Sequence, residues 1–387
     1  MPAGSVVVLE EPHVIERRCL GQQLGRHPLL RDLIPVQLDG ALPALQRLTA
    51  MTPVEAVIPG TELGVTLAAE LAEALRLPGA GSRAGRTFRD KLALRAAAAA
   101  MGVRQPRWRE VTSPTDVRAA MRELGGESFV LKPANLAGSQ GVVMLDTATD
   151  VDEAWRATTA GRSDRPEPSG LRFLVEERLT GPEISVECLV SHGRITFTNT
   201  TDKHVLPGPY PVEVGHVLPR LRSTRVAEEL AAFMSSLVTA TGMGDGILHG
   251  EWILTTGGPA LVECAARIPG DNILALLDLA YGTAISFLYL EAMAGRSIDH
   301  TPAPERGAAV RYLTPRAGTV RRVSGVAAAR EVPGVHEVVI GVAPGEPVNP
   351  LRASYDRVGY VIATGAHASA AWDTASRAAA LVTIETD

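Results

Sequence analysis

The chain has 387 residues, of which 45% are hydrophobic and 21% are charged, and its formal net charge is −5 at pH 7. This length exceeds one average domain and predicts two or three lobes that share a cleft. The acidic balance argues against a nucleic-acid binder that works through bulk electrostatics, and no run of about 18 apolar residues indicates a membrane span.

The first 85 residues predict a small parallel sheet with helices packed on it. Residues 5–9 and 55–58 are β-rich and apolar, whereas residues 43–50 and 62–75 favour helices. No GxGxxG pattern follows the first strand, so we expect no dinucleotide site there. The glycine-rich residues 79–85 are typical of a linker, which predicts that this lobe ends near residue 85.

The next region predicts a helix and then a hairpin with a ligand-binding loop. Residues 90–101 are Ala-rich, with Asp90 in the first helical turn and Lys91 at the start. Strands at 108–111, 128–132 and 142–145 and a helix at 114–124 follow. In the loop 133–141, Gly138 and Gly141 allow close backbone approach to a ligand, and Ser139 adds a hydroxyl. The loop is not a Walker A motif, because GxxxxGK[ST] is absent.

The second half of the chain predicts mainly antiparallel strands. We expect a helix at 150–159, a polar loop at 161–170, and strands at 171–177, 183–191 and 194–201, the last ended by residues 202–203. A Pro/Gly-rich segment, 206–219, precedes a helix at 225–241, a hairpin with strands at 247–254 and 260–265, and helices at 272–281 and 284–294. From residue 307, strands at 308–313, 319–322, 336–340 and 359–363 and a helix at 368–382 predict a small α+β module that caps one side of the site.

The hairpin at 247–265 carries one acid on each strand, Glu251 and Glu263. A hairpin can place both carboxylates on one face, and two carboxylates that close repel each other unless a divalent cation lies between them. Arg267 follows four residues later and suits an anionic phosphate. For an isolated pair of acids, two solvated side chains on an outer face are the alternative.

Taken in order, four pieces of the chain resemble the ATP-grasp superfamily and, within it, the L-amino acid ligases. They are Asp90-Lys91 at a helix start, VLKP before AGSQGV at 130–142, VEERLTGPE at 175–183, and HGE followed by VECAAR in the hairpin. The tail from 307 resembles the small C-terminal domain of those ligases. The resemblance implies a multidomain α/β and α+β fold. Its parts are a Rossmann-like lobe (1–85), a central region with the small ATP-clamping lobe (86–175), a large ATP-clamping lobe (176–306) and a C-terminal α+β module (307–387).

The resemblance also implies a role for each matching residue. The phosphates of ATP meet Lys91 and Lys132 beneath the loop Gly138, Ser139, Gln140 and Gly141. The adenine amino group meets Glu176, the adenine edge meets the backbone of Glu177 and Leu179, and the ribose hydroxyls meet Glu183. Glu251 and Glu263 bridge Mg²⁺ to the nucleotide, and Arg267 stabilises the transferred phosphate. The amino-acid substrates are handled by Glu213 and His216, with Asp271 lining their pocket.

These roles predict an ATP-dependent carboxylate–amine ligase that joins two amino acids, or an amino acid and an amine, through an acylphosphate. ATP and Mg²⁺, as two ions, are the expected cofactors, with Mn²⁺ as an alternative ion. Ala265 replaces the Asn that many relatives place two residues after the second metal acid, which leaves the number of ions open. A biotin-carboxylase-like enzyme that activates bicarbonate and a non-catalytic ATP-binding regulator are the alternatives.

The expected partners are small amino-acid or amine substrates, with neither nucleic acid nor membrane. A homodimer is the default arrangement. The start of the chain lacks the pattern of a secretory signal. The three cysteines are widely spaced and lack CxxC spacing, which favours buried thiols in a reducing cytoplasm.

Overall fold

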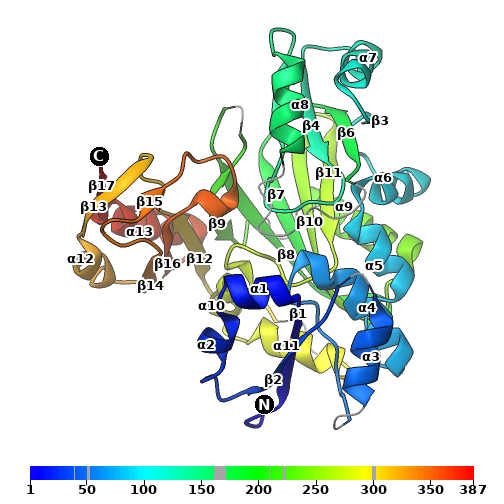
Figure 1. Ribbon diagram of the computed structural model, residues 1–387, viewed down its shortest axis with the longest axis vertical. Helices are drawn as coiled ribbons and strands as arrows, with labels where there is room; N and C mark the ends of the chain where they lie inside the picture. Colours follow the sequence, from blue (N-terminus) through cyan, green and yellow to red (C-terminus); the bar gives the residue numbers. More distant parts are fainter. Residues whose placement is uncertain (39, 50–52, 161–170, 209, 221–223, 299–301) are drawn as a thin grey trace.

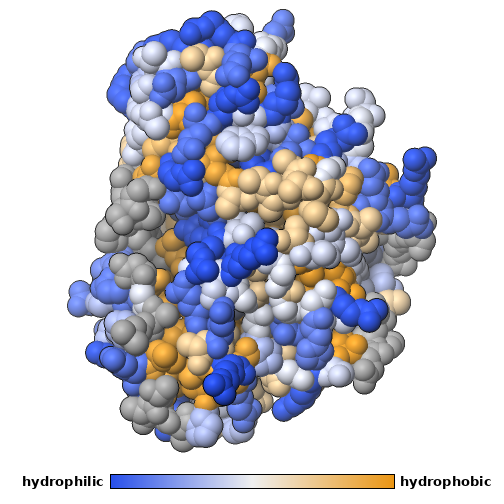
Figure 2. All heavy atoms as spheres, turned by 90° about the vertical axis from the view of Figure 1, so that its right-hand side faces the viewer, coloured by the Kyte–Doolittle hydropathy of each residue, from blue (hydrophilic) through white to orange (hydrophobic). Residues whose placement is uncertain are grey.

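The structure is a computed structural model of the chain, and it describes every residue except 39, 50–52, 161–170, 209, 221–223 and 299–301. Figure 1 shows a small lobe (α7, α8, β3–β6) above a large sheet, the N-terminal lobe and α10–α11 below, and the C-terminal segments to one side. The predicted loop at 161–170 lies outside the described residues. Figure 2 shows hydrophilic and hydrophobic residues intermixed on one face of the molecule.

The N-terminal lobe contains one parallel strand pair flanked by helices, as predicted in outline. Its elements are β1 (Val6–Glu10), α1 (Pro12–Arg17), α2 (Leu20–Leu24), β2 (Leu30–Pro35), α3 (Ala41–Thr49), the 3₁₀ turn η1 (Glu62–Gly64), α4 (Val65–Leu75) and α5 (Ser82–Arg89). The predicted strand at 55–58 is wrong. Those residues form no ladder, because Val57 packs into the lobe's core while Ile58 packs into the core below the large sheet.

The predicted linker at 79–85 is partly wrong, because α5 begins within it at Ser82. Ala84 and Phe88 are buried on one face of α5 and join the main core. A Cβ at Gly85 would lie 2.8 Å from the Cβ of Ala69 on α4, so glycine lets the two helices approach closely. Here the glycine serves helix packing.

The small lobe is a four-stranded antiparallel sheet in the order β3-β6-β4-β5. Its strands are β3 (Trp108–Val111), β4 (Ser128–Pro133), β5 (Val143–Asp146) and β6 (Phe173–Glu177), packed on α7 (Pro114–Leu124) and α8 (Val151–Thr159). Before this sheet, α6 (Lys91–Ala100) starts at an N-cap: the Asp90 carboxylate accepts hydrogen bonds from the backbone of Leu92 and Ala93. This cap fixes Lys91 as the first residue of the helix.

Eight antiparallel strands form the large sheet, in the order β11-β10-β7-β8-β9-β12-β16-β14. They are β7 (Glu183–Ser191), β8 (Arg194–Val205), β9 (Glu213–Leu218), β10 (Gly246–Thr255), β11 (Gly258–Ala265), β12 (Gly307–Tyr312), β14 (Val335–Ile340) and β16 (Gly359–Gly365). One face packs on α9 (Arg225–Thr241). The other packs on α10 (Ile273–Tyr281) and α11 (Ile285–Met293).

The alternation of side chains along these strands separates the core from the site. On β7, Ile184, Val186 and Cys188 pack towards α9, and each fully buried aliphatic side chain stabilises such a core by roughly 1.5–3 kcal/mol. The alternate residues of β7, including Glu183 and Glu187, therefore face the opposite side of the sheet. The same alternation sends Trp252 of β10 to the core and Glu251 to the other face.

Two predictions in this sheet are wrong in detail. β8 continues to Val205 rather than ending at 202–203, because Lys203 and His204 pair with β9. The Pro/Gly-rich segment contains a regular strand, β9, with His216 opposite Lys203. Both differences bring residues into the sheet that the sequence had assigned to loops.

The C-terminal residues extend the large sheet instead of forming only a separate cap. β12, β16 and β14 continue the sheet across residue 306, and α13 (Ala368–Leu381) covers them. A second sheet joins β13 (Gly318–Ser324), β15 (Pro347–Val348) and β17 (Thr383–Thr386), whereas α12 (Val326–Arg330) packs on β14 and α13. The division at residues 85, 175 and 306 stays a prediction.

None of the described helices is long and apolar enough to cross a membrane alone. α10 and α11 pass such a test only as a pair, and they are bent by 110° relative to each other.

Candidate active site

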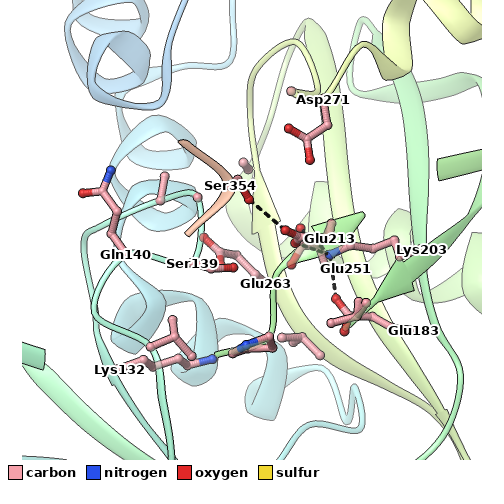
Figure 3. A pocket seen from close by; sticks show the side chains of 18 of the residues that line it. Lys132, Ser139, Gln140, Glu183, Lys203, Glu213, Glu251, Glu263, Asp271 and Ser354 are labelled. Atoms are coloured by element: carbon pink, nitrogen blue, oxygen red, sulfur yellow. Dashed lines mark hydrogen bonds and ion pairs between the residues drawn. The ribbon is translucent and has the colours of Figure 1, made fainter. Parts of the chain in front are cut away.

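A cavity of about 780 Å³ lies between the small lobe, the large sheet, the N-terminal lobe and a C-terminal turn. Figure 3 shows carboxylates and lysines from several strands converging on it. All but one of the predicted site residues line it: Lys91, Lys132, Gly138, Ser139, Gln140, Glu176, Glu177, Leu179, Glu183, Glu213, His216, Glu251, Glu263, Arg267 and Asp271. The exception is Gly141, where an added Cβ would lie 2.9 Å from both Pro133 and the Thr158 carbonyl oxygen, so this glycine serves packing.

The two hairpin acids lie together as predicted. Glu251 and Glu263 are direct partners in the β10–β11 ladder, and a register shift follows between Glu251 and Trp252. Both line the cavity, and each carboxylate also meets an ammonium group: Glu251 lies 3.0 Å from Lys203, and Glu263 lies 2.8 Å from Lys91. The alternative of two solvated acids on an outer face is therefore wrong for this hairpin.

Lys203 is one of the site residues that the sequence did not predict. Its Nζ lies 2.6 Å from Glu183, 3.0 Å from Glu251 and 3.3 Å from Glu213, and the residue is only 8% exposed. Burial alone would lower the pKa of Lys203, but the three carboxylates outweigh burial and hold its pKa well above the usual value. The ammonium is therefore charged and links the predicted ribose, metal and amine contacts (Figure 3).

The predicted phosphate end contains two lysines and a loop with unusual backbone angles. Lys91 donates to the carbonyl oxygen of Leu136 at 2.7 Å, which fixes the start of the loop. Gly138 and Ser139 then adopt φ values of 67° and 59°. Such left-handed residues turn successive N–H groups in one direction and can form an anion-binding concavity. Lys132 reaches the cavity from the end of β4, and burial lowers its pKa against the opposing effect of Glu176.

Glu176, predicted to meet the adenine amino group, is engaged on both carboxylate oxygens. Oε1 lies 2.7 Å from Arg95 and Oε2 lies 2.7 Å from Lys132. Burial would raise the pKa of Glu176, but Arg95 and Lys132 together lower it. Glu177 accepts from the backbone and guanidinium of Arg107. The side chain of Glu176 therefore positions Lys132, and its contact with an adenine amino group stays a prediction.

Arg267 lines the cavity and is held by the N-terminal lobe. Its Nε donates to Glu62 at 2.6 Å, and another guanidinium nitrogen donates to the carbonyl oxygen of Ile268 at 2.9 Å. Glu62 belongs to η1 and is itself almost buried. The N-terminal lobe thus orients the arginine that the sequence predicts at the transferred phosphate.

The predicted amino-acid end is a tightly bonded charged cluster. Nε2 of His216 lies 3.0 Å from Asp271, and Nδ1 is buried without a hydrogen-bond partner among the described residues. Two guanidinium nitrogens of Arg357 donate to Asp271 at 2.9 and 2.5 Å. Burial would raise the pKa of Asp271, but His216 and Arg357 hold it far below the usual range. Asp271 is therefore an ionised carboxylate at the cavity wall, and it engages Nε2 of His216.

A buried network stands behind Glu251. His249 contacts Glu251 at 3.4 Å through Nε2 and Glu187 at 3.0 Å through Nδ1. Glu187 also accepts from Asn199 and Thr201. Burial opposes the charge on His249, yet Glu187 and Glu251 raise its pKa to about 9. This network restricts how Glu251 can turn.

The donor set fits a magnesium ion. Glu251 and Glu263 offer hard carboxylate oxygens from facing ladder positions, and Ala265 offers no side-chain ligand. Within the described residues, no group of three or more His, Cys, Asp or Glu side chains has metal-binding geometry. Mg²⁺ commonly takes one or two carboxylates and completes its coordination shell with phosphate oxygens and water. Glu251 and Glu263 would therefore hold the ion only together with the phosphates of a bound nucleotide.

The site residues that were not predicted differ in how much signal the sequence carries for them. Lys203 carried a usable signal, since a lysine inside an otherwise β-rich run is unusual in a buried strand. Arg357 and Glu62 carried none, because they lie 86 residues after Asp271 and 205 residues before Arg267, respectively, and join the site only through the fold.

The family comparisons agree with this geometry. Residues 126–275 match the ATP-grasp domain, and residues 311–387 match the L-amino acid ligase C-terminal domain 2. The chain is 26% identical over 336 residues to the uncharacterized protein y4rH of Sinorhizobium fredii, covering 86% of this chain and 69% of that protein. It is 27% identical over 272 residues to the alanine–anticapsin ligase of Bacillus subtilis, covering 65% of this chain and 57% of the ligase.

Among solved structures, the L-amino acid ligase from Bacillus licheniformis has the same fold. The TM-score is 0.78 at 19% identity, and 98% of each chain is covered. The ATP-grasp fold predicted from the sequence is thereby confirmed. The chain spans only about 57% of the length of the alanine–anticapsin ligase that it matches.

Proposed function

We propose that this chain, an ATP-grasp protein with the C-terminal domain of the L-amino acid ligases, is an ATP-dependent carboxylate–amine ligase that acts on amino acids. The observation that carries the proposal is the arrangement of charge in the cavity. Lys91, Lys132, Glu251, Glu263 and Arg267 all line it, and the amino-acid cluster around Asp271 lies in the same cavity. ATP and an amino-acid carboxylate would therefore meet in one cavity.

The first step is activation of a carboxylate. A carboxylate oxygen attacks the γ-phosphorus of ATP, the bond from that phosphorus to the bridging oxygen breaks, and ADP leaves with the electron pair. Lys91 and Lys132 bind phosphate oxygens and Arg267 stabilises the charge on the phosphoryl group in transfer, so the residues act by position and electrostatics. Magnesium held at Glu251 and Glu263 would supply further neutralisation of phosphate charge.

The second step is attack by an amine on the acyl carbon. A nitrogen–carbon bond forms, the carbon–oxygen bond to phosphate breaks, and orthophosphate leaves with the electron pair while the nitrogen loses a proton. Asp271 suits the binding of an ammonium group rather than removal of its proton, because His216 and Arg357 hold its pKa low. Glu213 lines the same end, where contacts with Ser354 and Lys203 fix its position, and we propose Glu213 as the acceptor of the proton. His216 acts by holding Asp271.

Details of the cofactors and setting extend this proposal. We propose Mg²⁺ as the resident ion, with Mn²⁺ able to replace it. Because the side chain of Ala265 has no atom that can coordinate a metal, a second ion would be coordinated by Glu263 and the nucleotide alone. The three cysteines are unpaired, which suits a reducing cytoplasm; Cys188 and Cys264 are buried as predicted, whereas Cys19 is exposed and that part of the prediction is wrong. A homodimer stays a prediction.

The test is phosphate release in a screen over pairs of L-amino acids and amines, with ATP and Mg²⁺. If the chain is a ligase, we expect phosphate release that requires two substrates, together with an amide product detectable by mass spectrometry. Bicarbonate is included as a single substrate. Release with bicarbonate alone would favour the carboxylase alternative, and tight ATP binding with no release from any pair would favour the regulatory one.

A further inference from the structure

A short turn of the C-terminal region forms one wall of the cavity. It consists of the 3₁₀ turn η2 (Ser354–Asp356) and Arg357, between β15 and β16. Ser354, Tyr355 and Arg357 all line the cavity. The ring of Tyr355 also faces the phosphate loop: a Cβ at Gly138 would lie 2.8 Å from it. This turn is more than 80 residues away in sequence from the nearest predicted site residue, Asp271.

Arg357 connects the turn to two other elements of the site. Besides its two hydrogen bonds to Asp271, it donates to the backbone carbonyl oxygen of Glu213 at 3.1 Å and to that of Ser354 at 2.7 Å. Its guanidinium stacks on the ring of Tyr312, 3.7 Å from the centroid. These contacts fix the plane and the direction of the guanidinium, as expected for a rigid planar donor.

The turn holds two carboxylates that line the cavity, those of Asp271 and Glu213. Asp271 has φ of 57°, a left-handed conformation that Asp adopts more readily than most residues, and Arg357 and His216 hold its carboxylate. Ser354 Oγ donates to Glu213 Oε2 at 2.8 Å, drawn as a dashed line in Figure 3. The turn therefore fixes both carboxylates of the amino-acid end.

A purely structural role does not account for this arrangement. The Arg357 side chain is 9% exposed and that of Asp271 24% exposed, so the pair has lost most of its water. Replacing a buried ion pair by well-packed apolar side chains is often neutral or stabilising. Here the pair lies at the cavity wall, with one carboxylate open to the space where a substrate would lie.

We propose that Arg357 and Ser354 are positioning residues of the active site: they fix Asp271 and Glu213 to bind the charged amino group of an amino-acid substrate. The C-terminal module is then a part of the amino-acid subsite, and the hydrogen bonds of the Arg357 and Ser354 side chains to carboxylates go to that subsite. This inference rests on the ligase function proposed above. It adds residues from the C-terminal turn to the site.

The experiment compares Arg357→Met, Arg357→Lys and Ser354→Ala with the wild type. Arg330→Met is the matched control: this arginine also belongs to the C-terminal module and donates to a backbone carbonyl, that of Val338, away from the cavity. For each protein, steady-state KM is measured for ATP and for the amino-acid pair that the wild type turns over best. MgATP affinity is measured by calorimetry, and folding by thermal melting.

We expect Arg357→Met to raise the KM of at least one amino acid tenfold or more while KM and affinity for ATP stay within twofold. Arg357→Lys should recover part of the loss, because it restores charge without the bidentate geometry. Ser354→Ala should raise the same KM severalfold with an unchanged melting temperature, and it keeps the test informative if Arg357→Met fails to fold. Arg330→Met should match the wild type.

Amino-acid KM values within twofold of wild type in Ser354→Ala and in a folded Arg357 variant would overturn the inference and leave the ligase function standing. An equal loss of ATP and amino-acid binding would also overturn it, because the turn would then support the whole cavity. A wild type that releases no phosphate with any pair would contradict the ligase function itself, and this inference with it.

Discussion

Substitution of Lys203 by Met removes an ammonium group that contacts three carboxylates of the site. Lys203 lies 2.6–3.3 Å from Glu183, Glu251 and Glu213, and the side chain is 2% exposed. A unit-charge pair at about 4 Å is worth about 4 kcal/mol at an effective dielectric constant near 20, but desolvation offsets much of it. Removing one partner of a buried pair leaves the other uncompensated, which typically costs about 3–5 kcal/mol.

The assay is urea-induced unfolding of Lys203→Met at pH 7 without nucleotide or metal. The matched control is Arg172→Met. Arg172 also bridges two carboxylates, Glu110 at 2.8 Å and Asp90 at 3.1 Å, but its side chain is 47% exposed. Solvent screens such a pair, so we expect the control to lose about 1 kcal/mol or less. Typical domains are stable by about 5–15 kcal/mol, so the loss in Lys203→Met should be a large fraction of the total.

Two results would contradict this reasoning. Equal losses in the two variants would mean that burial does not set the strength of the Lys203 contacts. A loss in Lys203→Met below about 1 kcal/mol would mean that the three carboxylates find other compensation, and that Lys203 does not link the subsites as described.

The remaining predictions concern other parts of the site. Glu251→Gln and Glu263→Gln should each abolish phosphate release and weaken Mg²⁺ affinity for the nucleotide complex; near-wild-type release in either would contradict the metal assignment. Asp271→Asn should raise amino-acid KM with ATP affinity unchanged, and an unaltered KM would remove Asp271 from the subsite. Gly138→Ala should weaken ATP binding, because its φ is 67° and a Cβ would meet Tyr355; calorimetry showing wild-type affinity would exclude a loop role. Because its pKa is raised to about 9, protonated His249 stabilises the fold fully below about pH 6.5, and this stabilisation is lost as the pH rises through 9. The free energy of unfolding should fall by at most about 1.4 kcal/mol per pH unit in this range, and His249→Gln should lack this pH dependence in urea-induced unfolding.

Local patterns predicted much of the fold. Helices such as α9 and the hairpin of β10 and β11 were expected almost residue for residue, because apolar periodicity and a Gly-Gly turn are read within one segment. The strand at 55–58 was wrong because the same apolar residues can pack against two cores without joining a sheet. β9 was missed because proline and glycine nearby outweighed its short β-rich run.

The site residues show the same difference between local and long-range information. Glu251 and Glu263 come from one hairpin, so their meeting could be predicted from the sequence. Lys203 acts only because β8 continues past residue 202 and brings its side chain between three acids. Arg357 reaches Asp271 through the path of the C-terminal turn, and no spacing in the sequence records that contact.

The measurement that tests the central claim most directly is the fate of the nucleotide, since attack at the γ-phosphorus leaves ADP, whereas adenylation leaves AMP and pyrophosphate. The reaction is run with a carboxyl-¹⁸O-labelled amino acid and the best partner amine, and the nucleotides and phosphate are separated and weighed by mass spectrometry. We predict ADP and orthophosphate in equal amounts with the amide, and one ¹⁸O atom in the released phosphate. AMP as the stoichiometric product, or phosphate without label, would contradict the acylphosphate mechanism and the assignment of Lys91, Lys132 and Arg267 to the transferred phosphate.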